Sequence, residues 1–124
     1  MPIRDMPAEA IALVAAGTTY LPSESGIEAG HFASREIEAT MQITAIVGTD
    51  PTLQVTPQYS YDKVTWIDQP STYVFDLITG GVTSLPAAQT LQLTTTAIYM
   101  RFKLVAAGTV FTSAAGTLWA VMKS

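Results

Sequence analysis

The sequence predicts an all-β fold: an antiparallel two-sheet sandwich of the jelly-roll type, with about eight strands. Three observations support this prediction. Several segments alternate apolar and polar side chains with period two, which is the pattern of a half-buried strand. Residues that favour turns separate these segments at roughly ten-residue spacing. No long stretch of the chain carries a helical period that would compete with the strands.

The N-terminal segment 1–8 contains two prolines and two charged side chains, and we predict that it is an arm that does not fold alone. Residues 9–124 are predicted to form a single β-sandwich domain. The alanine-rich run Glu9–Ala16 fits a helix that stops at Gly17. The β-branched and aromatic residues Thr18–Tyr20 favour a strand instead, and we take a strand as the prediction.

The clearest strand signal begins after a predicted loop at Leu21–Gly30. Apolar residues alternate with polar ones at Ile37, Ala39, Met41, Ile43, Ala45 and Val47. Gly48–Pro51 then supplies a turn, because glycine permits a positive φ and proline fixes φ at a value that turns use. A second alternating run, Leu53–Tyr59, completes a hairpin. Pro57 has no N–H for a ladder hydrogen bond, so this strand is predicted to be at a sheet edge or bulged there.

Five further strands are predicted in the rest of the chain, separated by turns. The strands are Val64–Asp68, Thr72–Ile78, Thr90–Thr96, Ile98–Val105 and Thr117–Met122, and the turns are Ser60–Lys63, Gly80–Gly81 and Ala107–Thr109. One short pattern occurs twice, as Leu13–Thr18 and again as Leu104–Thr109. We interpret the repeat as two similar corners at which a strand ends in a turn.

Composition narrows the function classes. A chain of 124 residues fits one domain, and 48% hydrophobic with 13% charged residues excludes an intrinsically disordered protein. A surface poor in charge is typical of an interface. The net charge of −4 and the absence of a basic stripe argue against nucleic acid as a partner. The sequence has no cysteine, which excludes disulfides and thiolate metal sites.

The N-terminus does not predict a membrane partner. Its apolar run, Ala10–Ala16, is far shorter than the roughly 20 residues of a membrane span. Asp5 and Glu9 lie where a signal peptide would carry only positive charge. We expect a soluble protein without an export signal.

No constellation of residues predicts catalysis. The one histidine, His31, stands in a glycine-containing stretch without a nucleophile motif around it, so a solvated side chain is expected. Glu36 and Glu38 share one strand face, and a solvated face is the more economical interpretation than a pair of glycosidase carboxylates. Scattered aspartates at predicted turns are expected to cap backbone groups. We therefore predict no enzyme activity, no cofactor and no metal site.

Aromatic residues gather in the middle third of the chain, at Tyr59, Tyr61, Trp66, Tyr73 and Phe75. Exposed rings on a β-sandwich can form a sugar platform or a protein hot spot, whereas buried rings belong to the core. Trp66 and Phe75 are predicted to be core residues. Trp119 is predicted to face away from Leu118 and Ala120, so that either both faces of its sheet are covered or Trp119 contacts a partner.

Two stretches resemble small structural proteins of tailed bacteriophages. The first runs from Ile43 to Trp66 and includes the turn Gly48-Thr49-Asp50-Pro51-Thr52-Leu53 and the segment Val64-Thr65-Trp66. The second, Tyr99–Thr109, resembles the penultimate strand and turn of the same group. The resemblance implies a capsid decoration (cement) protein that binds and stabilises the assembled head. It implies no catalytic residues.

The expected partner is therefore the major capsid protein of the same particle, and the expected location is the capsid surface of a virion made in the host cytoplasm. Two alternatives stay open: a carbohydrate-binding or host-recognition module, and a tail-tube or connector component. Self-association into a dimer or trimer, or contacts within a lattice, is also expected through the N-terminal arm and one sheet edge. The arm can become ordered on a neighbour, and few charges guard the strand edges. The predicted partner-binding residues are Pro2, Ile3, Arg4, Met6 and Trp119.

Overall fold

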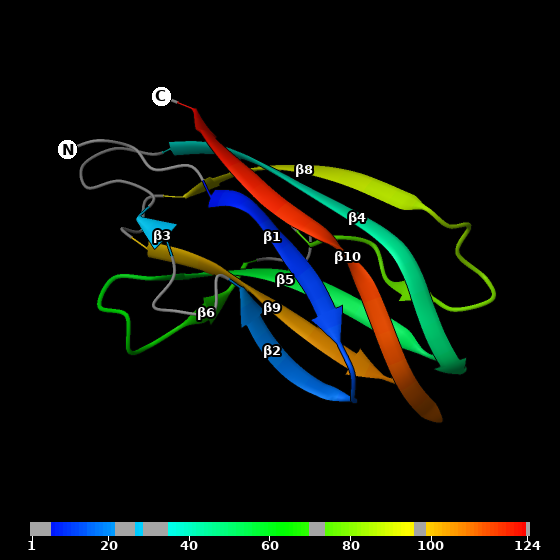
Figure 1. The fold of residues 1–124 in the computed structure, drawn as a ribbon. Coiled ribbons are helices and arrows are strands. Elements are labelled where there is room, and N and C mark those ends of the chain that lie inside the picture. The colour runs from blue at the N-terminus through cyan, green and yellow to red at the C-terminus, as the bar shows by residue number, and fades with distance from the viewer. Residues whose placement is uncertain (1–5, 22–26, 29–34, 70–73, 96–98, 124) are drawn as a thin grey trace.

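The computed structural model of the protein describes residues 6–21, 27–28, 35–69, 74–95 and 99–123. These residues form ten strands and no helix, in two antiparallel sheets, which confirms the predicted all-β sandwich (Figure 1). In chain order the strands are β1 Met6–Leu13, β2 Gly17–Leu21, β3 Ile27–Glu28, β4 Arg35–Thr49, β5 Thr52–Ser60, β6 Ile67–Asp68, β7 Ile78–Thr79, β8 Ala87–Thr95, β9 Tyr99–Ala107 and β10 Val110–Lys123.

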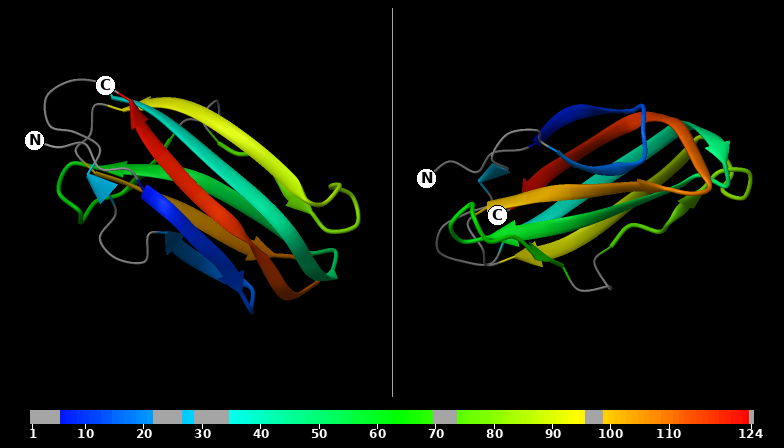
Figure 2. Two further views of the ribbon diagram at one scale, coloured as in Figure 1. Left: turned by 45° about the horizontal axis from the view of Figure 1, so that its top comes forward. Right: turned by 90° about the horizontal axis from the view of Figure 1, so that it is seen from below.

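The strand order is that of a jelly roll. One sheet, called sheet A here, has the order β1-β10-β4-β8, and sheet B has the order β2-β9-β5-β6. Strand β3 pairs with β9 beyond the end of β2, and β7 pairs with β5 beyond β6, so each short strand continues the line of another. Counted in this way, the fold has eight strand positions. The first pairs with the last (β1 with β10), the second with the seventh (β2 with β9), the third with the sixth (β4 with β8) and the fourth with the fifth (β5 with β6). This is the pairing of one long hairpin wrapped into two layers (Figure 2).

The core lies between the two layers, and strand alternation supplies it. On β4 the buried side chains are Ile37, Ala39, Met41 and Ile43, and on β9 they are Met100, Phe102, Leu104 and Ala106. Leu118 and Ala120 of β10 face the same core, as their alternation predicts. Ile11 and Leu53 add to it from β1 and β5. The segments that follow Ile37 and Ile98 therefore bury the faces expected from their sequence.

Sharp corners connect the two sheets at one end of the sandwich. Gly17 and Gly108 have φ of 140° and 131° at the corners that lead out of β1 and out of β9. These are the two copies of the repeated sequence pattern, and the interpretation as similar corners is confirmed. Gly48 and Asp50 also have positive φ, at the predicted turn between β4 and β5.

The starts of β10 and β1 differ from the sequence prediction. β10 begins at Val110, well before the predicted Thr117, and its register against β4 shifts at Phe111/Ser113 and at Ala115/Gly116. These irregularities interrupt the period-two pattern, which explains why the first half of β10 was not predicted. β1 begins at Met6, so residues 6–8 belong to a strand and not to the predicted arm, of which 1–5 lie outside the described residues.

Pro57 is accommodated within a strand that has neighbours on both sides. β5 lies between β9 and the line of β6 and β7, so it is not the outermost strand. The carbonyl of Pro57 accepts a hydrogen bond from the N–H of Gln69, so the proline nitrogen also faces that side. Strand pairing is interrupted there after β6, and the missing donor therefore breaks no continuous ladder.

The predicted strands Val64–Asp68 and Thr72–Ile78 are mostly wrong. Only Ile67–Asp68 and Ile78–Thr79 pair as strands, and residues 74–77 are irregular, while 70–73 lie outside the described residues. Phe75 is nevertheless in the core, as predicted, because its N–H donates to the carbonyl of Val55 and holds it at the edge of sheet B.

Candidate functional site

Of the five predicted partner-binding residues, Met6 and Trp119 lie in neighbouring strands of sheet A. Pro2, Ile3 and Arg4 lie outside the described residues. Met6 is in β1, paired with Ala120 of β10, and Trp119 is the next residue along β10. Trp119 is half-buried, on the outward-facing side of sheet A, opposite the face that Leu118 and Ala120 bury. The structure therefore brings two of the five predicted residues to neighbouring positions on one sheet.

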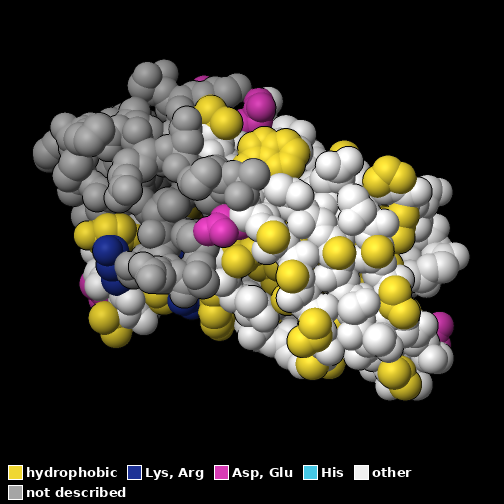
Figure 3. Space-filling model, viewed as in Figure 1, with side chains coloured by type: hydrophobic (Ala, Val, Ile, Leu, Met, Phe, Trp, Pro, Cys, Tyr) yellow, Lys and Arg dark blue, Asp and Glu magenta, His cyan; other side chains and the backbone are white. Residues whose placement is uncertain are grey.

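We call the outer face of sheet A around this residue the Trp119 face. Its described outward side chains are mainly threonine, glutamine and alanine, and the charged ones are Glu36 and Glu38 at one end. Its members include Ala10, Ala12, Thr40, Gln42, Thr44, Ala88, Thr90, Gln92, Thr117, Trp119 and Val121. Figure 3 shows this side of the molecule, with few charged side chains among uncharged and apolar ones.

Beside this face, the corner end of the sandwich exposes valines. Because neighbouring strands are antiparallel, the corners that follow β1, β4, β7 and β9 all lie at this end. Val14 and Val82 are 83% and 80% exposed, and Val47 and Val110 are about half exposed. Scattered exposed apolar residues are ordinary, but these four valines come from four different corners and place exposed apolar surface at one end of the sandwich.

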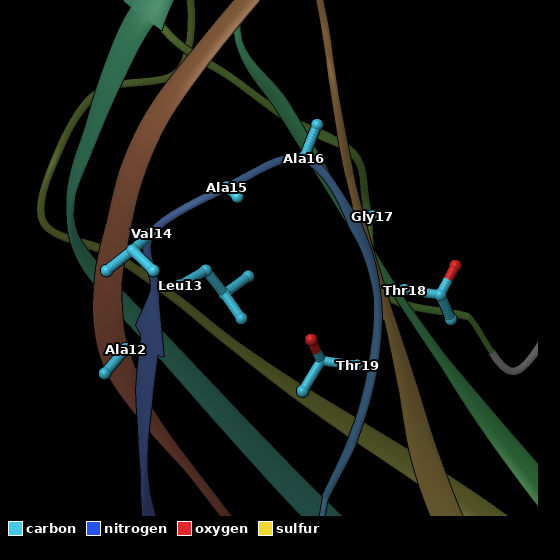
Figure 4. Close-up of a pocket in the computed structure, with 8 residues that line it drawn as sticks. All are labelled: Ala12, Leu13, Val14, Ala15, Ala16, Gly17, Thr18 and Thr19. Carbon is cyan, nitrogen blue, oxygen red and sulfur yellow. The ribbon is translucent and has the colours of Figure 1, made fainter.

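A shallow hollow of about 270 Å³ lies under the β1–β2 corner (Figure 4). Leu13 and Thr19 point into it, whereas Val14 and Thr18 point away. Its eight lining residues are Ala12, Leu13, Val14, Ala15, Ala16, Gly17, Thr18 and Thr19, and none of them is titratable or a metal ligand of the usual types. The hollow therefore offers no chemistry.

The outer face of sheet B carries a second feature, which we call the Arg101 cluster: Tyr20, Gln58, Lys63, Trp66, Asp68, Tyr99, Arg101 and Lys103. The order β2-β9-β5-β6 places Tyr20 on one side of Arg101 and Trp66 on the other. The guanidinium carbon of Arg101 is 3.8 Å from the ring centroid of Tyr20 and 4.3 Å from that of Trp66. Both distances are within cation–π range.

A chain of hydrogen bonds fixes the cluster. Arg101 Nε donates to Gln58 Oε1 at 2.7 Å, and Gln58 Nε2 donates to Asp68 Oδ1 at 2.7 Å. Lys103 Nζ forms an ion pair with Asp68, 3.0 Å from Oδ2. The hydrogen bonds from Gln58 and Lys103 lower the pKa of Asp68, and burial lowers the pKa of Arg101. Arg101 nevertheless stays protonated at neutral pH.

The turn between β5 and β6 carries Trp66 and Lys63 onto this face. Asp62 Oδ1 accepts hydrogen bonds from the N–H groups of Val64 and Thr65, each at 2.8 Å. Those backbone hydrogen bonds, that of Thr65 first, lower the pKa of Asp62. Here the expectation that aspartates cap turns is confirmed. Lys63 Nζ lies 4.6 Å from the ring centroid of Tyr99.

Sequence reasoning missed the Arg101 cluster and misplaced one of its members. Trp66 was predicted to be core, but it is only half-buried and stacks on Arg101 from outside the sheet. The available signal was the alternation of Tyr99, Arg101 and Lys103 opposite the core residues of the same strand. That pattern predicts a shared face, but it does not reveal that Tyr20 and Trp66 flank it.

The remaining candidates for chemistry are not assembled into a site by the described residues. His31 lies outside them. Glu36 and Glu38 are on the outer face of sheet A, where Gln92 Nε2 is 3.4 Å from Glu38 Oε2. In the part of the chain that the structure describes, no three potential metal-binding side chains come together, and no helix could span a membrane. Comparison with family models, curated proteins and solved structures gives no match.

Proposed function

We propose that this protein is a structural component of a bacteriophage particle, a decoration (cement) protein that binds the major capsid protein on the assembled head and reinforces it. The observation that carries the proposal is the Trp119 face, a strand surface with a half-buried tryptophan, whose described charged side chains are limited to Glu36 and Glu38 at one end. Interfaces are depleted in charged residues and enriched in tryptophan at their core.

The Trp119 face suits a modest, repeated contact. Burying threonine, glutamine and alanine costs little desolvation when the hydroxyl and amide groups find partners, whereas burying charges costs much more. Two half-exposed valines, Val47 of β4 and Val110 of β10, extend the face toward the corner end. Each copy then buries a standard-sized interface at most, and many copies on one lattice add their contributions to the stability of the head.

Self-association is part of the proposal. β1 is the outermost strand of sheet A, and within its residues Glu9 is the one charge. Among the described residues no strand pairs with the outer edge of β1, and its proline, Pro7, lies at the start of the strand beside a register shift, so the edge from Glu9 onward can pair with a second copy. Antiparallel pairing of β1 with its symmetry mate would join the two A sheets around a two-fold axis. Among the dimer and trimer expected from the sequence, this geometry favours the dimer.

The dimer is tested by light scattering on the purified protein and on two variants. Ala12→Lys places a charge on exposed β1 and should convert the dimer to a monomer. Deleting residues 2–5 removes only the segment before β1 and should leave the mass unchanged. A wild-type protein that is monomeric at all concentrations contradicts edge pairing.

Head binding is tested by co-sedimentation of the purified protein with intact heads of the same phage that lack it. Trp119→Ser and Gln42→Lys alter the Trp119 face, and each should weaken head binding at least about tenfold, the usual loss at an interface hot spot. Thr18→Lys is the matched control, because Thr18 is exposed on the outer side of sheet B. It should bind heads like the wild type.

Three results decide the proposal. Saturable head binding that both sheet A variants weaken supports it, and so does a higher melting temperature of the decorated heads. Equal losses in all three variants would move the contact away from the Trp119 face. Failure of the wild-type protein to bind heads, together with formation of rings by the isolated protein, would favour a tail-tube or connector component.

A further inference from the structure

The Arg101 cluster lies on the side of the sandwich opposite the Trp119 face, since one belongs to the outer face of sheet B and the other to that of sheet A. A ligand of the cluster and a partner of the Trp119 face can therefore be bound at the same time. The cluster is not needed for the proposed head binding, and what it binds is a separate question.

Positive charge is concentrated in this cluster. Among the side chains that the structure describes, the lysines and arginines are Lys63, Arg101 and Lys103, and all three are members. Among the described side chains, Asp68 and the adjacent turn residue Asp62 are the carboxylates beside them, and Glu28 of β3 pairs with Tyr99 in the backbone register. The whole chain, in contrast, has a net charge of −4. The three described cations lie on one face of an acidic protein, and grouped cations favour an anionic ligand.

Arg101 is the cation that is left for such a ligand. Asp68 is already engaged, because Gln58 and Lys103 both donate to Oδ1 and Lys103 also donates to Oδ2. The guanidinium uses Nε for Gln58. Its two terminal amino groups donate to no residue in the described part of the chain. These two groups form the edge of the fork that binds a carboxylate with two parallel hydrogen bonds.

The fork is also held in place before a ligand arrives. Tyr20 and Trp66 flank the guanidinium plane, and Gln58 cannot turn its amide without losing its hydrogen bond to Asp68. A preorganised arginine loses little side-chain entropy on binding. A surface lysine is different, because its flexible side chain does not hold the charged group in one position.

Aromatic rings surround the charge on an open strand surface. Tyr20 is 38% exposed and Tyr61, in the adjoining turn, is 56% exposed, while Trp66 and Tyr99 are half-buried. Exposed rings pack against the C–H faces of a pyranose, and a fixed cation binds a carboxylate on that sugar. We propose that the Arg101 cluster binds an acidic saccharide, a glycan whose sugars carry a carboxylate group, with Arg101 as the residue that selects the acid.

Other anionic partners fit the observations less well. A peptide in extended form binds along a strand edge or in a groove, and the cluster lies on the flat side of the three strands β2, β9 and β5. A nucleic acid requires several phosphate contacts along a basic stripe, whereas the cluster has three cations, of which Lys103 is already paired with Asp68. An isolated acidic sugar needs one cation and a ring beside it, which is what the face offers.

The test uses a short oligomer of galacturonic acid and, as its neutral counterpart, the same oligomer with its carboxyl groups reduced. Binding is followed by tryptophan fluorescence in a Trp119→Phe background, in which Trp66 is the sole tryptophan of the chain. The acidic oligomer should change the emission saturably at low salt, and the neutral one should bind at least about tenfold more weakly, as expected for the loss of a charge-assisted pair.

Three variants assign the contact. Arg101→Gln should weaken binding about tenfold or more, and Arg101→Lys should recover only part of the loss, since lysine keeps the charge but not the fork. Lys123→Gln, in β10 of the other sheet, removes the same charge and should change affinity less than about twofold. Circular dichroism checks folding, and if Arg101→Gln does not fold, Lys63→Gln should still weaken binding measurably.

The proposal fails if the neutral oligomer binds as tightly as the acidic one, or if Lys123→Gln weakens binding as much as Arg101→Gln. It also fails if the acidic oligomer does not bind at all. Oligoglutamate that binds more tightly than the saccharide, with the same dependence on Arg101, would replace the glycan by an acidic protein segment. None of these outcomes affects co-sedimentation with heads, so the two proposals stand or fall separately.

Discussion

Replacing Gly108 or Gly17 by alanine separates backbone strain at a positive φ from steric crowding around the added Cβ. The two glycines occupy equivalent positions in the repeated sequence pattern, but their surroundings differ. Both glycines have φ far into the positive region, at 131° and 140°, so alanine is strained by a similar amount at either corner. That strain costs about 1–3 kcal/mol, and the lower entropy of the unfolded alanine chain offsets about 0.4–1 kcal/mol of it. The net cost common to both variants is then roughly 1–2 kcal/mol.

The surroundings of the two corners differ. A Cβ at Gly17 would meet no atom within 4 Å, because β2 is an edge strand and its corner is open. A Cβ at Gly108 would be 2.3 Å from the carbonyl oxygen of Asp50 and 2.9 Å from Cα of Pro51. Backbone must move to admit it, and overpacking of this kind costs about 1–3 kcal/mol more.

Urea unfolding of the wild type and both variants measures the difference. Gly108→Ala should lower the free energy of unfolding by about 1–3 kcal/mol more than Gly17→Ala does, which corresponds to roughly 1 M in the urea midpoint if the slope is unchanged. Equal losses for the two variants would refute the reasoning, because they would mean that the β4–β5 turn yields without cost. A loss that is larger for Gly17→Ala would contradict the close packing of the Gly108 corner itself.

Two further predictions concern the core and pH. Leu118→Ala should cost about 2–5 kcal/mol, because Leu118 is fully buried between the sheets, and the neighbouring Trp119→Ser should cost less because its ring is only half-buried; urea unfolding compares them. Asp68 has a lowered pKa, so its carboxylate stabilises the fold above its ordinary pKa of about 4, and that contribution is lost as the pH falls through the lower folded value. Because its side chain is 51% exposed, the effect should stay below about 1 kcal/mol. Asp68→Asn should flatten this part of the pH dependence of unfolding, and a curve that keeps its shape in the variant would contradict the assignment.

The parts of the fold that sequence predicts are those in which one side of a strand faces the core without interruption. Met100, Phe102 and Leu104 alternate with polar residues for the whole of β9, and all three are buried. The first half of β10 escapes prediction because two register shifts move residues between faces. Val64 has the composition of a strand residue yet is 82% exposed in a turn, since the hydrogen bonds of Asp62 decide the local structure there.

The candidate sites are less predictable because their members are distant in sequence. Alternation identifies Trp119 as an outward residue, and the structure confirms that orientation. Arg101 and Trp66 are far apart in sequence, so the alternation within one strand cannot predict that they are in contact. A tryptophan is in general expected to bury most of its ring in the core. A cation that draws an aromatic ring out to the surface is a tertiary effect, and neither propensity nor composition records it.

The two proposed surfaces together restrict how the protein can sit on a head. Docking through sheet B would bury Arg101, Lys63 and the Lys103–Asp68 ion pair, and desolvating these charges costs several kcal/mol unless the capsid supplies matching groups. Docking through the Trp119 face leaves them in solvent, and the antiparallel two-layer fold then points them directly away from the head. The same strand alternation that builds the core therefore sets the proposed orientation, since the described outward residues of sheet A are uncharged except Glu36 and Glu38, whereas those of sheet B include Arg101, Lys103 and Asp68.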